Sequence, residues 1–93
     1  MYLHLGQDTV VKKADVVGIF DLDTATVAKA TRQYLSVREK EKQVVTVSFD
    51  LPRSFTVCAK PDGGNETVYL SPLSPGTLEK RANNNGFLIM MKE

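Results

Sequence analysis

Short runs of apolar, β-branched or alternating residues recur along this 93-residue chain, and only one longer stretch has helical spacing. Alternation of apolar and polar residues with period two is typical of a strand that buries one face. Turn residues separate most of these runs. The pattern predicts six short strands, at residues 2–5, 9–11, 16–22, 43–49, 55–60 and 67–71.

The stretch between the third and fourth predicted strands has the spacing of an amphipathic helix. Asp21, Asp23 and Thr24 stand at its start, where their side-chain oxygens can accept hydrogen bonds from the first helical turn. We expect the helix to run to about Lys42. Its buried stripe should consist of residues at three- and four-residue steps, namely Val27, Ala30, Thr31, Tyr34 and Leu35.

Turn residues connect the later strands. Residues 50–54 include a proline and predict a hairpin that pairs the fourth and fifth strands antiparallel. Residues 61–65, Pro-Asp-Gly-Gly-Asn, form the densest turn signal in the chain and predict a second hairpin. Ser74 followed by Pro75 predicts the start of a short C-terminal helix that ends by Ala82.

The expected fold is a single α+β domain over residues 1–82. It should contain a mostly antiparallel sheet of about six short strands, one longer amphipathic helix and a short C-terminal helix. Residues 83–93 form a tail whose apolar part, residues 87–91, has no core of its own to join. We expect this tail to be flexible or to dock on a neighbour. Because so small a domain leaves much of its surface uncovered, self-assembly is an economical way to add burial.

Charge and cysteine content exclude several classes of protein. Twelve Lys and Arg residues against eleven Asp and Glu residues give a net charge of +1, so nucleic-acid binding would require local clustering of basic residues. The single cysteine, Cys58, cannot form an internal disulfide. No secretory pattern is present, and the longest apolar run is far shorter than the roughly 20 residues that cross a bilayer. We therefore expect a cytoplasmic protein with no membrane contact.

The residue types needed for catalysis or metal binding do not cluster in the sequence. His4 and Cys58 are far apart, and both lie in strand patterns where a packing or hydrogen-bonding role is favoured. Asp21 and Asp23 already serve the predicted helix start, and residues 63–64, Gly-Gly, lack the Lys and Ser/Thr of a phosphate loop. The sequence therefore predicts no enzyme activity, no metal, no cofactor and no small-molecule substrate.

Basic residues remain as the candidates for a functional site. Lys29 and Arg32 are one turn apart on the outer face of the predicted helix, and Arg53 lies at the tip of the predicted hairpin. Lys12 and Lys13 end the second predicted strand. In a single copy, scattered solubilising charge is the simpler interpretation of these residues. Repetition around an oligomer would turn a few weak phosphate contacts into an effective DNA-binding surface.

Two segments resemble members of the RemA/RemB family of bacterial extracellular matrix regulators. The first consists of residues 1–6, Met-Tyr-Leu-His-Leu-Gly, with residues 15–21, and the second of residues 69–74 with residues 77–81. The resemblance covers residues 1 to about 82. It implies a role in activating biofilm matrix genes, beside RemA-type paralogues that form closed rings and bind DNA through repeated arginines.

Individual positions can be compared with the RemA-type pattern. Arg53 matches one of two adjacent arginines that RemA-type members carry between the two strands after the helix. A second arginine of that pattern falls on or beside Asp15 in this chain, where the charge is negative. The resemblance thus implies a DNA contact at Arg53 and shows a departure at Asp15.

Two hypotheses follow for the function. The first is a DNA-binding transcriptional regulator that acts as a homo-oligomer, with double-stranded DNA and a RemA-type paralogue as partners. The second is an oligomeric adaptor that binds proteins and no DNA, with residues 87–91 as its docking segment.

Overall fold

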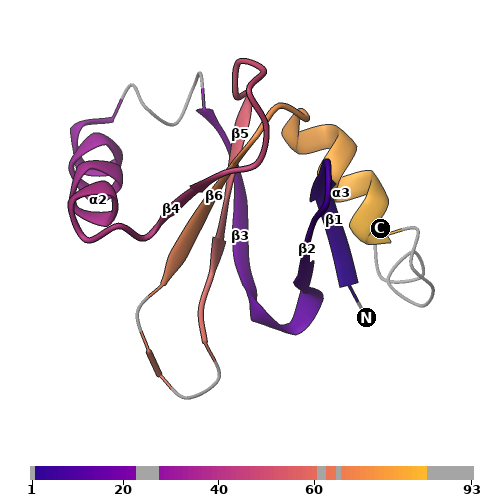
Figure 1. Ribbon diagram of the computed structural model, residues 1–93, viewed down its shortest axis with the longest axis horizontal. Helices are drawn as coiled ribbons and strands as arrows, with labels where there is room; N and C mark the ends of the chain where they lie inside the picture. The colour runs from indigo at the N-terminus through magenta and orange to yellow at the C-terminus, as the bar shows by residue number, and fades with distance from the viewer. Residues whose placement is uncertain (1, 23–27, 61–62, 65, 84–93) are drawn as a thin grey trace.

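The computed structural model describes residues 2–22, 28–60, 63–64 and 66–83 (Figure 1). Its strands are β1 (Tyr2–Gly6), β2 (Thr9–Lys12), β3 (Val16–Asp21), β4 (Val44–Thr46), β5 (Ser54–Cys58) and β6 (Thr67–Ser71). Its longer helices are α2 (Lys29–Lys40) and α3 (Pro75–Asn83), and a 3₁₀ turn, η1 (Lys13–Asp15), precedes β3. The predicted α+β class with six short strands is confirmed.

The strands form two sheets where the sequence predicted one. β1 and β2 pair as an antiparallel hairpin, and the positive φ angles of Gly6 (127°) and Gln7 (47°) let the chain reverse between them. The other strands form a four-stranded sheet in the order β3-β5-β6-β4. Within it β5 is antiparallel to both β3 and β6, whereas β4 is parallel to β6.

The predicted hairpin between the fourth and fifth strands is wrong. β4 ends at Thr46, and the chain then crosses the end of β6 before it enters β5. The crossing segment is held at both ends, because the Val47 N–H donates to the Leu70 carbonyl (3.0 Å) and the Arg53 N–H donates to the Ser71 carbonyl (2.8 Å). β6 therefore lies between β4 and β5 and pairs with both. The second predicted hairpin, which joins β5 and β6, is confirmed.

Helix α2 is shorter than predicted. Asp21 is the last residue of β3, and Leu22 directly after it is helical, as expected for a residue at a helix start, while Asp23, Thr24 and Val27 lie outside the described residues. Ala28 is the N-cap and makes no side-chain capping hydrogen bond. At the other end, the N–H of Gln43 donates to the carbonyl of Arg38 (2.8 Å), and Lys42 adopts a φ of 59°. These features form a Schellman motif, which ends the helix at Lys40.

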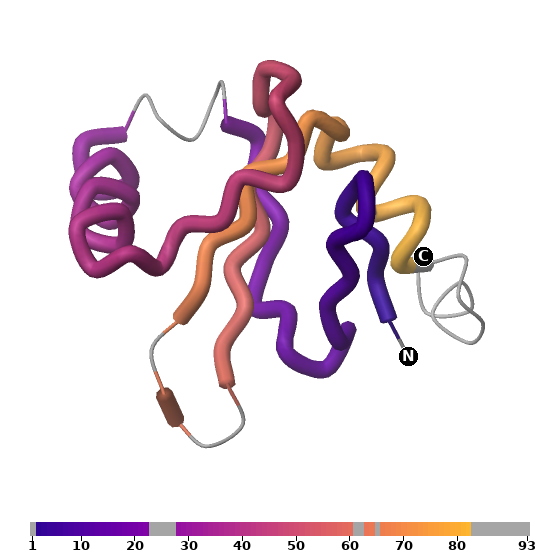
Figure 2. Tube along the Cα trace, viewed as in Figure 1, coloured from indigo at the N-terminus to yellow at the C-terminus, as the bar shows by residue number. Residues whose placement is uncertain are grey.

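The four-stranded sheet separates two layers (Figures 1 and 2). On one face, Tyr34 and Leu35 of α2 pack against a cluster that includes Phe55, Val57 and Val68. No residue of α2 is fully buried, and Ala30 of the predicted stripe is exposed.

The opposite face of the sheet carries the β1–β2 hairpin and α3. Leu3, Leu5 and Leu78 are completely or almost completely buried there. The Ser71 hydroxyl donates to the carbonyl of Leu5 (2.7 Å) and so ties β6 to β1. The predicted start of α3 is confirmed, since the Thr77 N–H donates to the Ser74 hydroxyl (3.2 Å). The predicted tail was residues 83–93; Asn83 is the last residue of α3, and residues 84–93 lie outside the described residues.

Candidate nucleic-acid interface

Arg53 ends the segment that crosses from β4 to β5, and it is not at a hairpin tip as predicted. Its side chain is exposed, whereas its backbone N–H and carbonyl both make hydrogen bonds. The Arg53 N–H donates to Ser71, and its carbonyl accepts a hydrogen bond from the Leu22 N–H (3.0 Å). The position of the side chain is therefore set by backbone hydrogen bonds to β6 and to the end of β3.

Lys29 and Arg32 lie in the first turn of α2, and both side chains are exposed. They are three residues apart, so they are neighbours on the helix surface. Arg32 lines a groove together with Leu22, which is the residue hydrogen-bonded to Arg53. The fold thus places Arg53 and Arg32 next to Leu22, and Lys29 adjoins Arg32 one turn away on α2.

Lys12 and Lys13 lie apart from this cluster. They follow one another at the junction of β2 and η1, on the layer of the sheet opposite α2 (Figure 1). The Lys13 ammonium donates to the carbonyl of Ala82 (2.5 Å) near the end of α3, where a positive charge stabilises the helix dipole. Two of the five predicted basic residues, Arg32 and Arg53, therefore share Leu22 as a neighbour, and Lys29 adjoins Arg32 on α2. Lys12 and Lys13 belong to a different surface.

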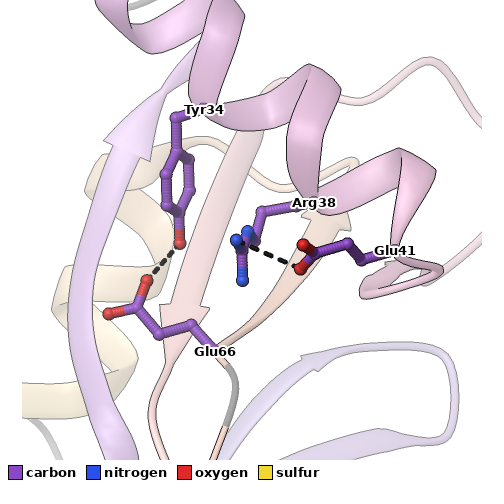
Figure 3. A network of polar contacts seen from close by, with 4 residues as sticks. All are labelled: Tyr34, Arg38, Glu41 and Glu66. Carbon is purple, nitrogen blue, oxygen red and sulfur yellow. Dashed lines mark hydrogen bonds and ion pairs between the residues drawn. The ribbon is translucent and has the colours of Figure 1, made fainter.

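A further arginine, Arg38, belongs to a polar network on the side of α2 that faces the sheet (Figure 3). Arg38 forms an ion pair with Glu41 (3.2 Å), and its guanidinium lies 5.5 Å from the centre of the Tyr34 ring. The Tyr34 hydroxyl donates to a carboxylate oxygen of Glu66 (2.5 Å). Burial, reinforced by this hydrogen bond, raises the pKa of Tyr34 to about 12. These contacts hold α2 against the chain just before β6 and commit Arg38 to a structural role.

His4 and Cys58, the other residues with reactive side chains, both lie where a structural role accounts for them. The His4 ring nitrogen is hydrogen-bonded to the carbonyl of Gln7 (2.5 Å) in the turn of the β1–β2 hairpin. Cys58 is buried. Its burial, and to a smaller extent the charge of Asp15, raises the pKa of its thiol to about 11.

Within the described residues, no group of His, Cys, Asp or Glu side chains is arranged to hold a metal ion. No helix in the described part of the chain is long and apolar enough to cross a membrane.

Phe49 and Leu51 were not predicted to matter, yet they are the most exposed large apolar residues of the described chain. Their relative exposures are 108% and 85%. The alternation of residues 43–49 predicted a strand, and that interpretation placed Phe49 on the same face as Val45 and Val47. The structure separates them, because Val47 is buried and Phe49 projects from the crossing segment. The adjacent Asp50 and Pro52 were the only sequence signals that this segment leaves the sheet.

Comparison with known proteins identifies a relative at high coverage. The chain is 40% identical over 82 residues to extracellular matrix regulatory protein B of Bacillus subtilis (strain 168). The alignment covers 88% of this chain and 90% of that protein. No family model matches the sequence. The resemblance predicted from the two terminal segments is confirmed, and the chain belongs to the family of extracellular matrix regulatory protein B.

Proposed function

We propose that this chain is a DNA-binding transcriptional regulator of extracellular matrix genes that acts in the cytoplasm as a homo-oligomer, without catalysis. The matrix role follows from the name of its relative in Bacillus subtilis, an extracellular matrix regulatory protein. The DNA contact follows from the arrangement of basic side chains in this chain. A RemA-type paralogue is a further proposed partner.

The observation that carries the DNA proposal is that Arg53 and Arg32 both adjoin Leu22, with Lys29 next to Arg32 on α2. These residues come from two segments more than 20 positions apart in sequence, and all three side chains are exposed. Arginine and lysine side chains reach phosphate oxygens, and the guanidinium group can bind a phosphate through two parallel hydrogen bonds. Lys12 and Lys13 would serve only DNA that extends to the opposite layer.

The number of contacts explains why the regulator would act as an oligomer. Each phosphate that a protein neutralises contributes a slope of about −0.9 to the plot of log affinity against log salt. Three cations in one copy support only weak binding, and the net charge of +1 adds no long-range attraction. Linked copies present the same cluster repeatedly along one DNA molecule, which multiplies the affinity without new contacts.

The test is a light-scattering mass measurement with and without long double-stranded DNA, at low and then moderate salt. We expect an oligomer that binds DNA and releases it as salt rises. Arg53→Ala should leave the mass of the free protein unchanged, weaken DNA binding and flatten its salt dependence, and Arg53→Glu should weaken binding further.

Lys60→Ala is the matched control, since Lys60 is an exposed cation at the other end of β5. It should bind DNA almost as the unmodified chain does. DNA affinity that does not change with salt, or that falls equally in both alanine variants, would contradict the proposed site.

A second candidate function is an oligomeric adaptor that binds proteins and no DNA. The exposure of Phe49 and Leu51 favours a protein-binding surface, as does the near-neutral net charge. Removal of all residues after Ala82 separates the two functions. Loss of a partner in a pull-down, with any DNA binding left unchanged, would support an adaptor role for the tail. Loss of DNA binding alone would exclude it.

A further inference from the structure

Phe49 and Leu51 form an apolar tip on an anchored segment. The segment is tied to β6 by the backbone hydrogen bonds of Val47 and Arg53. Within it the Asp50 N–H donates to the Ser48 hydroxyl (3.1 Å), and Ser48 is buried. The two apolar side chains are thus presented by a fixed backbone and have almost no cover from their own chain. Adjacent exposed apolar side chains of this size mark a contact surface.

An apolar groove lies between α2 and the β4–β6 edge of the sheet. It encloses about 460 Å³, and its apolar walls are Leu22, Leu35, Val44 and Leu70. The groove remains open because no residue of α2 is fully buried against the sheet. The apolar tip of the same chain does not fill it, since Phe49 and Leu51 are exposed.

The charges beside the tip complement those beside the groove. Arg32 and Glu39 line the groove seven residues apart on α2, which corresponds to about 10 Å along a helix axis. Asp50 and Arg53 flank Leu51 three residues apart, a span of up to about 10 Å in an extended chain. One orientation of the tip in the groove therefore pairs each charge with an opposite one. The reversed orientation would place like charges together.

We propose that the apolar tip, Phe49 and Leu51, seats in the α2 groove of a second copy of this chain. Asp50 then faces Arg32 of the second copy, and Arg53 faces its Glu39. These exposed ion pairs select the orientation and add little to the affinity, which the apolar tip supplies, so Arg53→Ala leaves the assembly in place. The inference rests on the homo-oligomer of the proposed function and assigns the surfaces that build it. Because the tip and the groove are different surfaces, each copy can both donate a tip and receive one, and the contact can repeat.

This contact would make the DNA site a joint property of two copies. It places Arg53 of one copy on α2 of the next, about 10 Å along the helix axis from Arg32. A guanidinium has five N–H donors and a carboxylate accepts two of them in a bidentate pair, so donors remain for a phosphate. The carboxylates fix the direction of both arginines, and the DNA backbone then completes the cluster.

Two variants test the contact by removing one surface each. In Phe49→Ser/Leu51→Ser the tip is made polar, and in Ser36→Trp an exposed residue of the groove wall becomes large enough to occupy the groove. All three positions are exposed in the single chain, so neither variant should disturb its folding. Val10→Ser is the matched control, because Val10 is exposed at 52% on the opposite layer.

Light scattering should show each variant alone as a single chain and the Val10→Ser control as an oligomer of unchanged mass. An equimolar mixture of the two variants should form a pair and nothing larger, since only one working tip and one working groove remain. Circular dichroism checks that both variants are folded.

Assembly of the serine variant with unchanged mass would overturn this contact and leave the proposed function standing. A mixture that stays monomeric although each variant is folded would likewise overturn this contact and leave the proposed function standing. An unmodified chain that assembles but binds no DNA would overturn the DNA-binding function and leave the contact in place.

Discussion

The two faces of the four-stranded sheet are covered to different degrees. The face under the β1–β2 hairpin and α3 buries Leu3, Leu5 and Leu78 to 1% exposure or less. The face under α2 is covered by a helix with no fully buried residue and is flanked by grooves. The first face is closed, whereas the second buries Phe55, Val57 and Val68 and also retains apolar surface beside α2. Under the proposed assembly, stability and self-association depend on different residues, which the following substitutions can separate.

Leu78→Ala should have the largest effect. Leu78 is completely buried and packs in the cluster that contains Leu3 and Leu5, so its truncation leaves a cavity in the closed face. We expect a loss of about 3 kcal/mol in the free energy of unfolding, measured by urea denaturation. A loss below about 1 kcal/mol would show that this face is also loosely packed.

Ser71→Ala should have the next largest effect. The Ser71 hydroxyl is buried, donates to the Leu5 carbonyl and accepts a hydrogen bond from the Leu73 N–H (3.1 Å). Its removal leaves both backbone groups without this partner, which should cost about 2 kcal/mol in urea denaturation. Ser36→Ala, at an exposed position on α2, is the control and should change stability little.

Leu35→Ala should have a smaller effect that depends on protein concentration. Leu35 is half-buried and lines the α2 groove, so the single chain should lose only about 1 kcal/mol. At concentrations where the chain assembles, the loss should grow, because assembly stabilises the folded state by mass action. Leu78→Ala should show a similar loss at every concentration. If Leu35→Ala loses the same free energy of unfolding at all concentrations, the two faces do not have the different roles proposed.

The smallest expected effect is the pH dependence that Tyr34 gives to the free energy of unfolding. Burial and the hydrogen bond to Glu66 raise the pKa of Tyr34 from 10.0 to about 12. The folded chain therefore holds this proton more tightly than the unfolded chain. The resulting stabilisation is fully present below pH 10 and is lost as pH rises toward 12. Urea denaturation of Tyr34→Phe should show a shallower decline over that range, and an identical decline would exclude this role.

Local sequence patterns were sufficient to locate most of the elements. Five of the six predicted strands lie within about two residues of the observed ones, because period two reports which face of a strand is buried. Ser74 and Pro75 marked the start of α3, since helix capping depends on neighbouring residues alone. The terminal segments also identified the family.

The order of the strands was not available from these patterns. Alternation in residues 43–49 is the same whether a strand pairs with β5 or with β6, so the predicted hairpin failed where the chain crosses β6. Phe49 continued the alternation and was assigned to the sheet, yet it is exposed on the crossing segment. Burial of an apolar side chain depends on which residues pack over it, and the alternation of apolar and polar residues does not indicate those residues.

The sequence by itself determined the family, the α+β class and the residue types available for a DNA contact. It placed arginines and lysines at positions 12, 13, 29, 32 and 53 without indicating which of them meet. Only the tertiary structure decided that Arg53 and Arg32 share Leu22 as a neighbour while Lys13 binds near the end of α3. The physical reason is that hydrogen bonds between distant strands and packing of a helix on a sheet join residues whose separation in sequence carries no sign of their contact.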